Sequence, residues 1–158
     1  MRKHRWLSAL ICIGCSGAIA AAASAKVALF SCKYEVENRG TAGWATVKVV
    51  GGEVQKVDFD DFYKSFPGRP GYQCGIGASR DDKETKWSRK GRSIEVEFVD
   101  APRYNDGSSM LILRTSNGIL LDMSNAKNTY CGAGASLPKS VLVPFASKKC
   151  VVKFWDYR

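Results

Sequence analysis

The chain has 158 residues, with 24 lysines and arginines against 15 aspartates and glutamates, and its formal net charge is +9. A chain of this length can bury a substantial core, which excludes a fold held together by disulfides alone. The only histidine is His4, and this scarcity restricts the chemistry that the protein can perform.

Residues 1–25 have the features of a cleaved export signal. Three basic residues precede the apolar run WLSALICIGCSGAIAAAA, which ends in the small-residue motif at 23–25. We predict cleavage after Ala25 and a single periplasmic or secreted domain at 26–158, without stable membrane insertion. Lipidation of Cys15 is the alternative that this pattern leaves open.

Removal of the signal changes both the charge and the available chemistry. It takes away three basic residues and the histidine, so 21 basic residues face 15 acidic ones and the net charge becomes +6. Without histidine the domain has no Ser-His-Asp or Cys-His arrangement and no histidine-containing zinc site. No glycine-rich phosphate-binding motif is present either. We therefore expect a protein that is not an enzyme and holds no cofactor or metal.

Clustered acidic residues leave one enzymatic alternative, a glycosidase that works with a pair of carboxylates. Such clusters are more often solvated faces or turn caps, and the first cluster lacks the glycine and final glutamate of an EF-hand calcium loop. The two clusters are Asp58, Asp60 and Asp61, and Asp81, Asp82 and Glu84.

An even number of cysteines remains after cleavage, which in an exported chain predicts two disulfides. The four are Cys32, Cys74, Cys131 and Cys150, and no CxxC pair suggests a redox or zinc motif. Three pairings are possible. We predict Cys131–Cys150, closing the last hairpin, together with Cys32–Cys74.

Short runs of alternating residues separated by turns predict strands. Residues 44–50 and 53–59 flank Gly51-Gly52, which is a strong hairpin signal. Pro144 indicates an edge position or a bulge in its strand. Six more strands are expected, at 27–36, 93–99, 109–115, 118–124, 140–146 and 150–156.

Helical signal is confined to 58–66, where Asp60 would cap one or two turns that stop at Pro67-Gly68. The sequence thus predicts an all-β protein. We expect a single small antiparallel β-sandwich or barrel of about eight strands with two disulfides.

Residues 75–91 read GIGASRDDKETKWSRKG, and SIEVEF follows shortly after them. A small-residue turn carrying a serine, then a tryptophan, a Lys-Gly turn and a strand is similar to the bacterial inhibitors of c-type lysozyme. The resemblance implies a small disulfide-held β fold that blocks the lysozyme cleft. Ser79 and Lys90 would meet the catalytic carboxylates, and Trp87 and Gly91 would shape the loop.

The leading hypothesis is therefore an exported inhibitor of a cell-wall hydrolase, above all a c-type lysozyme. The predicted partner-binding residues are Ser79, Arg80, Trp87, Lys90, Gly91 and Tyr104. The alternative is an envelope module that binds peptidoglycan or another anionic glycan through aromatic rings and basic side chains. Its candidate aromatics at strand ends and in loops are Trp44, Tyr63, Phe66, Tyr72, Trp87 and Tyr104. Nucleic acid is not an expected partner, and the oligomeric state stays open.

Overall fold

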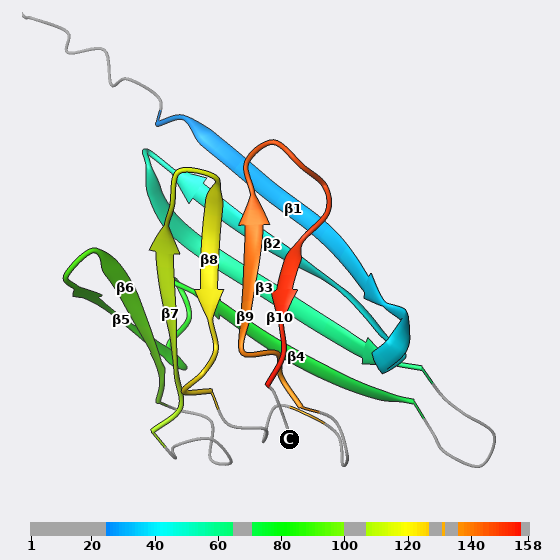
Figure 1. The fold of residues 1–158 in the computed structure, drawn as a ribbon. Coiled ribbons are helices and arrows are strands. Elements are labelled where there is room, and N and C mark those ends of the chain that lie inside the picture. Colours follow the sequence, from blue (N-terminus) through cyan, green and yellow to red (C-terminus); the bar gives the residue numbers. More distant parts are fainter. Residues whose placement is uncertain (1–24, 65–70, 100–106, 127–130, 132–135, 156–158) are drawn as a thin grey trace, which may run out of the picture.

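In the computed structural model, two antiparallel sheets pack face to face (Figure 1). The structure describes residues 25–64, 71–99, 107–126, 131 and 136–155. The four-stranded sheet has the order β1 (Val27–Val36), β2 (Thr41–Val50), β3 (Glu53–Tyr63), β4 (Tyr72–Ser79). The six-stranded sheet has the order β10-β9-β8-β7-β6-β5, made of β5 (Thr85–Lys90), β6 (Ser93–Phe98), β7 (Ser109–Arg114), β8 (Gly118–Asp122), β9 (Ser140–Pro144) and β10 (Val151–Lys153). A short 3-10 helix, η1 (Glu37–Arg39), joins β1 to β2.

Every strand pairs with its neighbour in the sequence, and the chain passes from one sheet to the other between β4 and β5. The long strands β1 to β4 run diagonally behind the shorter strands β7 to β10 (Figure 1). The predicted sandwich class is confirmed. The described residues hold ten strands rather than about eight, because β4 and β5 were not recognised as strands.

Alternation of side chains along the strands places one face of each sheet in a common core. The four-stranded sheet contributes Val47, Val57 and Phe59, which are at most 1% exposed. The opposing sheet contributes Leu121 and Val141, both fully buried. The outer face of the four-stranded sheet therefore points away from the core.

Strand β1 and residues 148–150 form a seam that joins the two sheets along one side. The Lys33 N–H donates to the Lys148 carbonyl at 2.8 Å, and the Cys150 N–H donates to the Lys33 carbonyl at 2.9 Å. The Cys32–Cys150 disulfide fastens this seam, with 5.1 Å between the two Cα atoms.

The disulfides form, but the predicted pairing was wrong, since the second bond joins Cys74 to Cys131. The predicted Cys131–Cys150 bond paired cysteines that flank the last hairpin. The folded chain instead brings its first strand beside the segment that precedes its last one, a proximity that sequence spacing does not reveal.

The helix expected at 58–66 was also wrong, because residues 53–63 form β3. Asp58 and Asp60 lie on the outer face of this strand, whereas Phe59 and Asp61 are buried. A buried aspartate interrupts the polar–apolar alternation that signals a strand. Strand β9 lies between β8 and β10, so Pro144 is not on an edge strand of the sheet. It ends β9 opposite Gly118, beyond the residues that pair with β10.

Asp61 belongs to a buried polar group inside the core. The Thr41 hydroxyl donates to Asp61 Oδ1, while Asp61 Oδ2 and the Tyr34 hydroxyl are buried without a hydrogen-bond partner in the part of the chain that the structure describes. Burial raises the pKa of Asp61 above its ordinary value of 3.8, against the opposing effect of the Thr41 hydrogen bond. Burial and the nearby Asp61 carboxylate also raise the pKa of Tyr34.

This raised pKa predicts a pH-dependent stability. The folded protein holds the Asp61 proton more tightly than the unfolded chain. The contribution of Asp61 to stability is therefore fully present below its unfolded pKa of about 4 and is lost as the pH rises through the folded pKa. Asp61→Asn removes this titration, and we expect its stability relative to the wild type to rise as the pH increases above about 4. Urea unfolding across this range measures the difference.

Glu35→Gln provides a control, because the contribution of Glu35 to stability changes with pH in the opposite direction. The Lys64 ammonium lowers the pKa of Glu35, so its small contribution is present above the unfolded pKa and is lost as the pH falls through the folded one. A stability difference between wild type and Asp61→Asn that stays constant with pH would contradict the role assigned to Asp61.

Candidate functional site

The structure separates the two residues that resemblance placed in one enzyme cleft. Ser79 ends β4, and its carbonyl accepts a hydrogen bond from Thr85 Oγ1 at 2.9 Å. Lys90 is the last residue of β5, which begins at Thr85, so the two ends of that strand lie roughly 16 Å apart. The two carboxylates of a glycosidase are only about 5 to 9.5 Å apart. Ser79 and Lys90 are therefore not brought together.

Other predicted partner-binding residues make contacts within the protein itself. The Arg80 guanidinium lies 4.9 Å from the centre of the Trp87 ring, and its Nε donates to the Val54 carbonyl at 2.9 Å. Lys90 Nζ pairs with Glu95 at 3.0 Å. Gly91 adopts a φ of 61°, which suits glycine in the β5–β6 turn. Tyr104 and Phe66 lie outside the described residues.

A different set of side chains gathers on the outer face of the four-stranded sheet. The register aligns Lys33, Trp44 and Asp60 in one row across β1, β2 and β3. The adjacent rows contain Ser31 with Thr46 and Asp58, and Glu35 with Ala42 and Phe62. We call the set Ser31, Lys33, Ala42, Trp44, Thr46 and Phe62 the Trp44 face.

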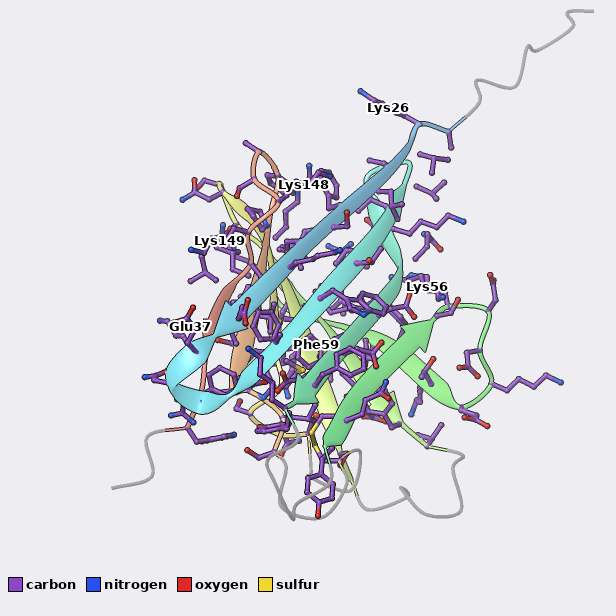
Figure 2. All side chains as sticks on the ribbon, turned by 90° about the vertical axis from the view of Figure 1, so that its right-hand side faces the viewer. Lys26, Glu37, Lys56, Phe59, Lys148 and Lys149 are labelled. Atoms are coloured by element: carbon purple, nitrogen blue, oxygen red, sulfur yellow. A yellow bond between two sulfur atoms is a disulfide. The ribbon has the colours of Figure 1, made fainter. Side chains whose placement is uncertain are left out.

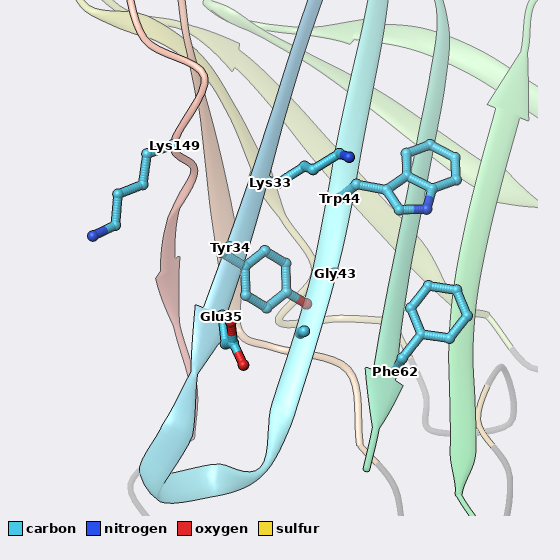
Figure 3. Close-up of a pocket in the computed structure, with 8 residues that line it drawn as sticks. Lys33, Tyr34, Glu35, Gly43, Trp44, Phe62 and Lys149 are labelled. Atoms are coloured by element: carbon cyan, nitrogen blue, oxygen red, sulfur yellow. The ribbon is translucent and has the colours of Figure 1, made fainter.

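The aromatic rings of this face remain accessible. Phe62 is 43% exposed, which is unusual for a large apolar side chain, and Trp44 is partly exposed. Figure 3 shows both rings and Lys33, whose side chain extends over β2 toward Trp44. The two aromatics sit on diagonal neighbours of adjacent strands, a spacing that long side chains can bridge.

Two open hollows flank Trp44 and share both its side chain and Lys33. One has a volume of about 540 Å³ and includes Ala42, Phe62 and Lys149 in its lining. The other has a volume of about 300 Å³ and is lined partly by hydroxyl and ammonium groups, those of Ser31, Thr46 and Lys148. These volumes fall in the range of ligand pockets, but both hollows are open, which suits an extended ligand lying across the sheet.

The carboxylates near the Trp44 face already have partners. Lys64 Nζ lies 2.6 Å from Glu35 Oε1, and this ammonium lowers the pKa of Glu35. Lys56 Nζ lies 3.0 Å from Asp58 Oδ2. The Gln73 side-chain amide donates to Asp60 at 2.8 Å.

Apart from Lys56 and Lys64, the lysines around this face form no ion pair with a described residue. Within the described ranges, no ion pair involves Lys33, Lys48, Lys148 or Lys149. Figure 2 shows Lys148 and Lys149 on the segment beside β1, where the seam holds them next to Lys33. The face therefore combines accessible aromatic rings with an excess of positive charge.

Sequence reasoning named Trp44 among the candidate aromatics but missed Lys33 and Phe62. The signal for both was the alternation in their strands, which puts them on the outer face. Their proximity to Trp44 depends on the register between strands. A one-residue change in that register would turn them away from each other.

Comparisons with protein-family models, curated proteins and solved structures found no match. Among the described residues, no helix is long and apolar enough to cross a membrane. The same residues contain no group of three or more histidine, cysteine, aspartate or glutamate side chains arranged to hold a metal ion.

Proposed function

We propose that the protein is an exported module that binds an anionic glycan of the cell envelope, such as peptidoglycan, on the Trp44 face. The observation that carries this proposal is the Lys33–Trp44 pair between two open hollows. Two disulfides fit an oxidising compartment, where such glycans are found.

The chemistry of the face matches this class of ligand. A sugar ring presents an apolar face of C–H groups, which can stack on the Trp44 and Phe62 rings. Its hydroxyls can exchange hydrogen bonds with Ser31 and Thr46. Carboxylate substituents on the glycan can pair with the Lys33 ammonium, a charge-assisted interaction. Because the hollows lie on both sides of Trp44, the ligand spans more than one sugar unit.

The test is binding to purified peptidoglycan, measured by co-sedimentation at low and high salt. We expect Trp44→Ala to weaken binding at least tenfold, because it removes the surface shared by both hollows. Lys33→Ala should weaken binding less and should also reduce its dependence on salt, since exposed charges are screened. Circular dichroism shows whether each variant keeps its fold.

Lys86→Ala is the matched control. Its side chain is 69% exposed on β5 of the other sheet, so the variant loses the same charge away from the Trp44 face. Absence of wild-type binding at low salt, or equal losses from Lys33→Ala and Lys86→Ala, would overturn the proposal.

Inhibition of a cell-wall hydrolase is the second candidate function. It is favoured by the acidic turn between β4 and β5, where Asp81, Asp82 and Glu84 are all exposed beside the packed Arg80–Trp87 pair. Such a turn would attract a basic enzyme. A stoichiometric excess of the oxidised protein should then reduce c-type lysozyme activity on cell walls. Because Ser79 and Lys90 are too far apart to enter one enzyme cleft together, only one of the two can contribute there. We therefore expect either Ser79→Ala or Lys90→Ala to weaken inhibition strongly, but not both.

A further inference from the structure

We propose a second binding site, independent of the Trp44 face, for a small carboxylate that carries one compact apolar group. The site is the cleft between the β2–β3 hairpin and strands β5 to β8, which we call the hairpin cleft. It has an apolar inner part and an arginine-rich rim, and these two parts recognise the two ends of the ligand.

The hollow between the two sheets has a volume of about 150 Å³, which includes the space beside the arginine rim as well as the apolar inner part. Its walls include Val54, Ile94, Ile112 and Ile119. Ile112 and Ile119 are only 2% exposed, so these walls belong to the core and are held rigidly by it.

Guanidinium groups dominate the rim. Arg89 Nη2 lies 3.1 Å from Glu53 Oε1, a contact that joins the two sheets across the cleft. Arg114 Nη1 lies 3.4 Å from the Gly52 carbonyl, a weak hydrogen bond. Arg92 also lines the cleft, and no hydrogen bond or ion pair joins its side chain to another described residue. The rim of the hairpin cleft thus contains three arginines and one carboxylate, that of Glu53.

The Arg89–Glu53 pair divides the inner hollow from a second, more open one. This outer hollow has a volume of about 370 Å³, and it shares Glu53, Arg89 and Ile94 with the inner one. Both side chains of the ion pair are accessible, with Arg89 70% and Glu53 52% exposed. An exposed pair of this kind is held weakly, so an incoming carboxylate can replace Glu53 on Arg89.

The recognition follows from this exchange. The ligand carboxylate binds the Arg89 guanidinium through two parallel hydrogen bonds, with Arg92 supplying further positive charge. Its apolar group fills the hollow against Ile112 and Ile119. Glu53 opposes binding twice, because it competes for Arg89 and repels the ligand's charge. A cationic ligand with the same apolar group is disfavoured by the same rim.

Three probes with one apolar group and different heads test the site: 4-phenylbutyrate, 4-phenylbutan-1-ol and 4-phenylbutylamine. Amide chemical-shift changes in NMR titrations give both affinity and location. We expect 4-phenylbutyrate to bind at least tenfold more tightly than the amine, with shifts concentrated in the β2–β3 hairpin and in β5 to β8. No binding by the carboxylate, or equal binding by all three probes, would overturn the proposal.

Two variants with opposite expected effects separate recognition from a general loss of structure. Arg89→Gln should weaken 4-phenylbutyrate binding severalfold, whereas Glu53→Gln should strengthen it although it breaks the same ion pair. Arg39→Gln, in η1, removes one positive charge away from the cleft and is expected to leave the affinity unchanged. Changes of the same sign in Arg89→Gln and Glu53→Gln would show that the ion pair acts only as a structural contact.

Discussion

Replacement of Cys32 and Cys150 by alanine is expected to lower the free energy of unfolding by about 5 kcal/mol, the largest effect of any change considered for this protein. The bond closes a loop with a sequence separation of 118 residues, and a long loop gives the greatest restriction of the unfolded chain. Denaturant unfolding of the oxidised wild type and of the double variant measures the loss.

The variant should also open the seam locally. The Lys33 and Cys150 backbone N–H groups hydrogen-bond across the seam, and without the disulfide we expect both to exchange with solvent faster. Cys74→Ala with Cys131→Ala is the matched control, since it removes a bond with a separation of 57 residues at another place. It should cost about 4 kcal/mol and leave those two amides protected relative to the rest of the sheet. Equal deprotection in both variants would contradict a local role for Cys32–Cys150.

Gly43→Ala is expected to destabilise the protein by about 3 kcal/mol, the largest effect of any single substitution considered. A Cβ atom at this position would clash with the Asp60 backbone carbonyl oxygen and would lie 2.6 Å from the Tyr34 hydroxyl. The backbone oxygen cannot move without displacing β3, and the Tyr34 ring packs inside the core. Thermal and urea unfolding measure the change.

Two glycines of β4 serve as graded controls for this variant. A Cβ at Gly75 would meet the flexible Asp60 side chain at 2.7 Å, which can rotate away, so Gly75→Ala should cost less than Gly43→Ala. At Gly77 the nearest atom lies at an ordinary 3.4 Å, and alanine there should be neutral or stabilising by about 0.5 kcal/mol because glycine weakens strands. A loss at Gly77 as large as at Gly43 would show that steric contact is not the cause.

The local patterns of the sequence predicted most of the strands. Strand β1 has the predicted bounds, 27–36, because its apolar residues and flanking turn are strong signals. Strand β4 was missed because its outward positions include Gly75 and Gly77, and β5 because most of its side chains are exposed and polar. In both strands the pairing with a neighbour outweighs weak intrinsic preference.

The candidate site was harder to predict because it depends on register. The Gly51-Gly52 turn pairs Val50 with Glu53, and unbroken pairing from there would place Trp44 opposite Phe59. An irregularity between Lys48 and Val49 shifts the register by one residue, so Trp44 instead faces Asp60 on the outer side. No residue type in the hairpin signals this shift. The sequence could identify Trp44, but not its neighbours across the strands.

The position of Cys32–Cys150 also determines how the domain responds to mechanical force. The two cysteines lie near the two ends of the described chain, so tension applied at residues 26 and 155 passes through a covalent bond. Only the first part of β1 and the segment that follows Cys150 can be peeled from their neighbours. The disulfide bypasses the backbone of the 117 residues between the cysteines. The hairpin cleft, and all of the Trp44 face except Ser31, therefore keep their shape while the ends are pulled.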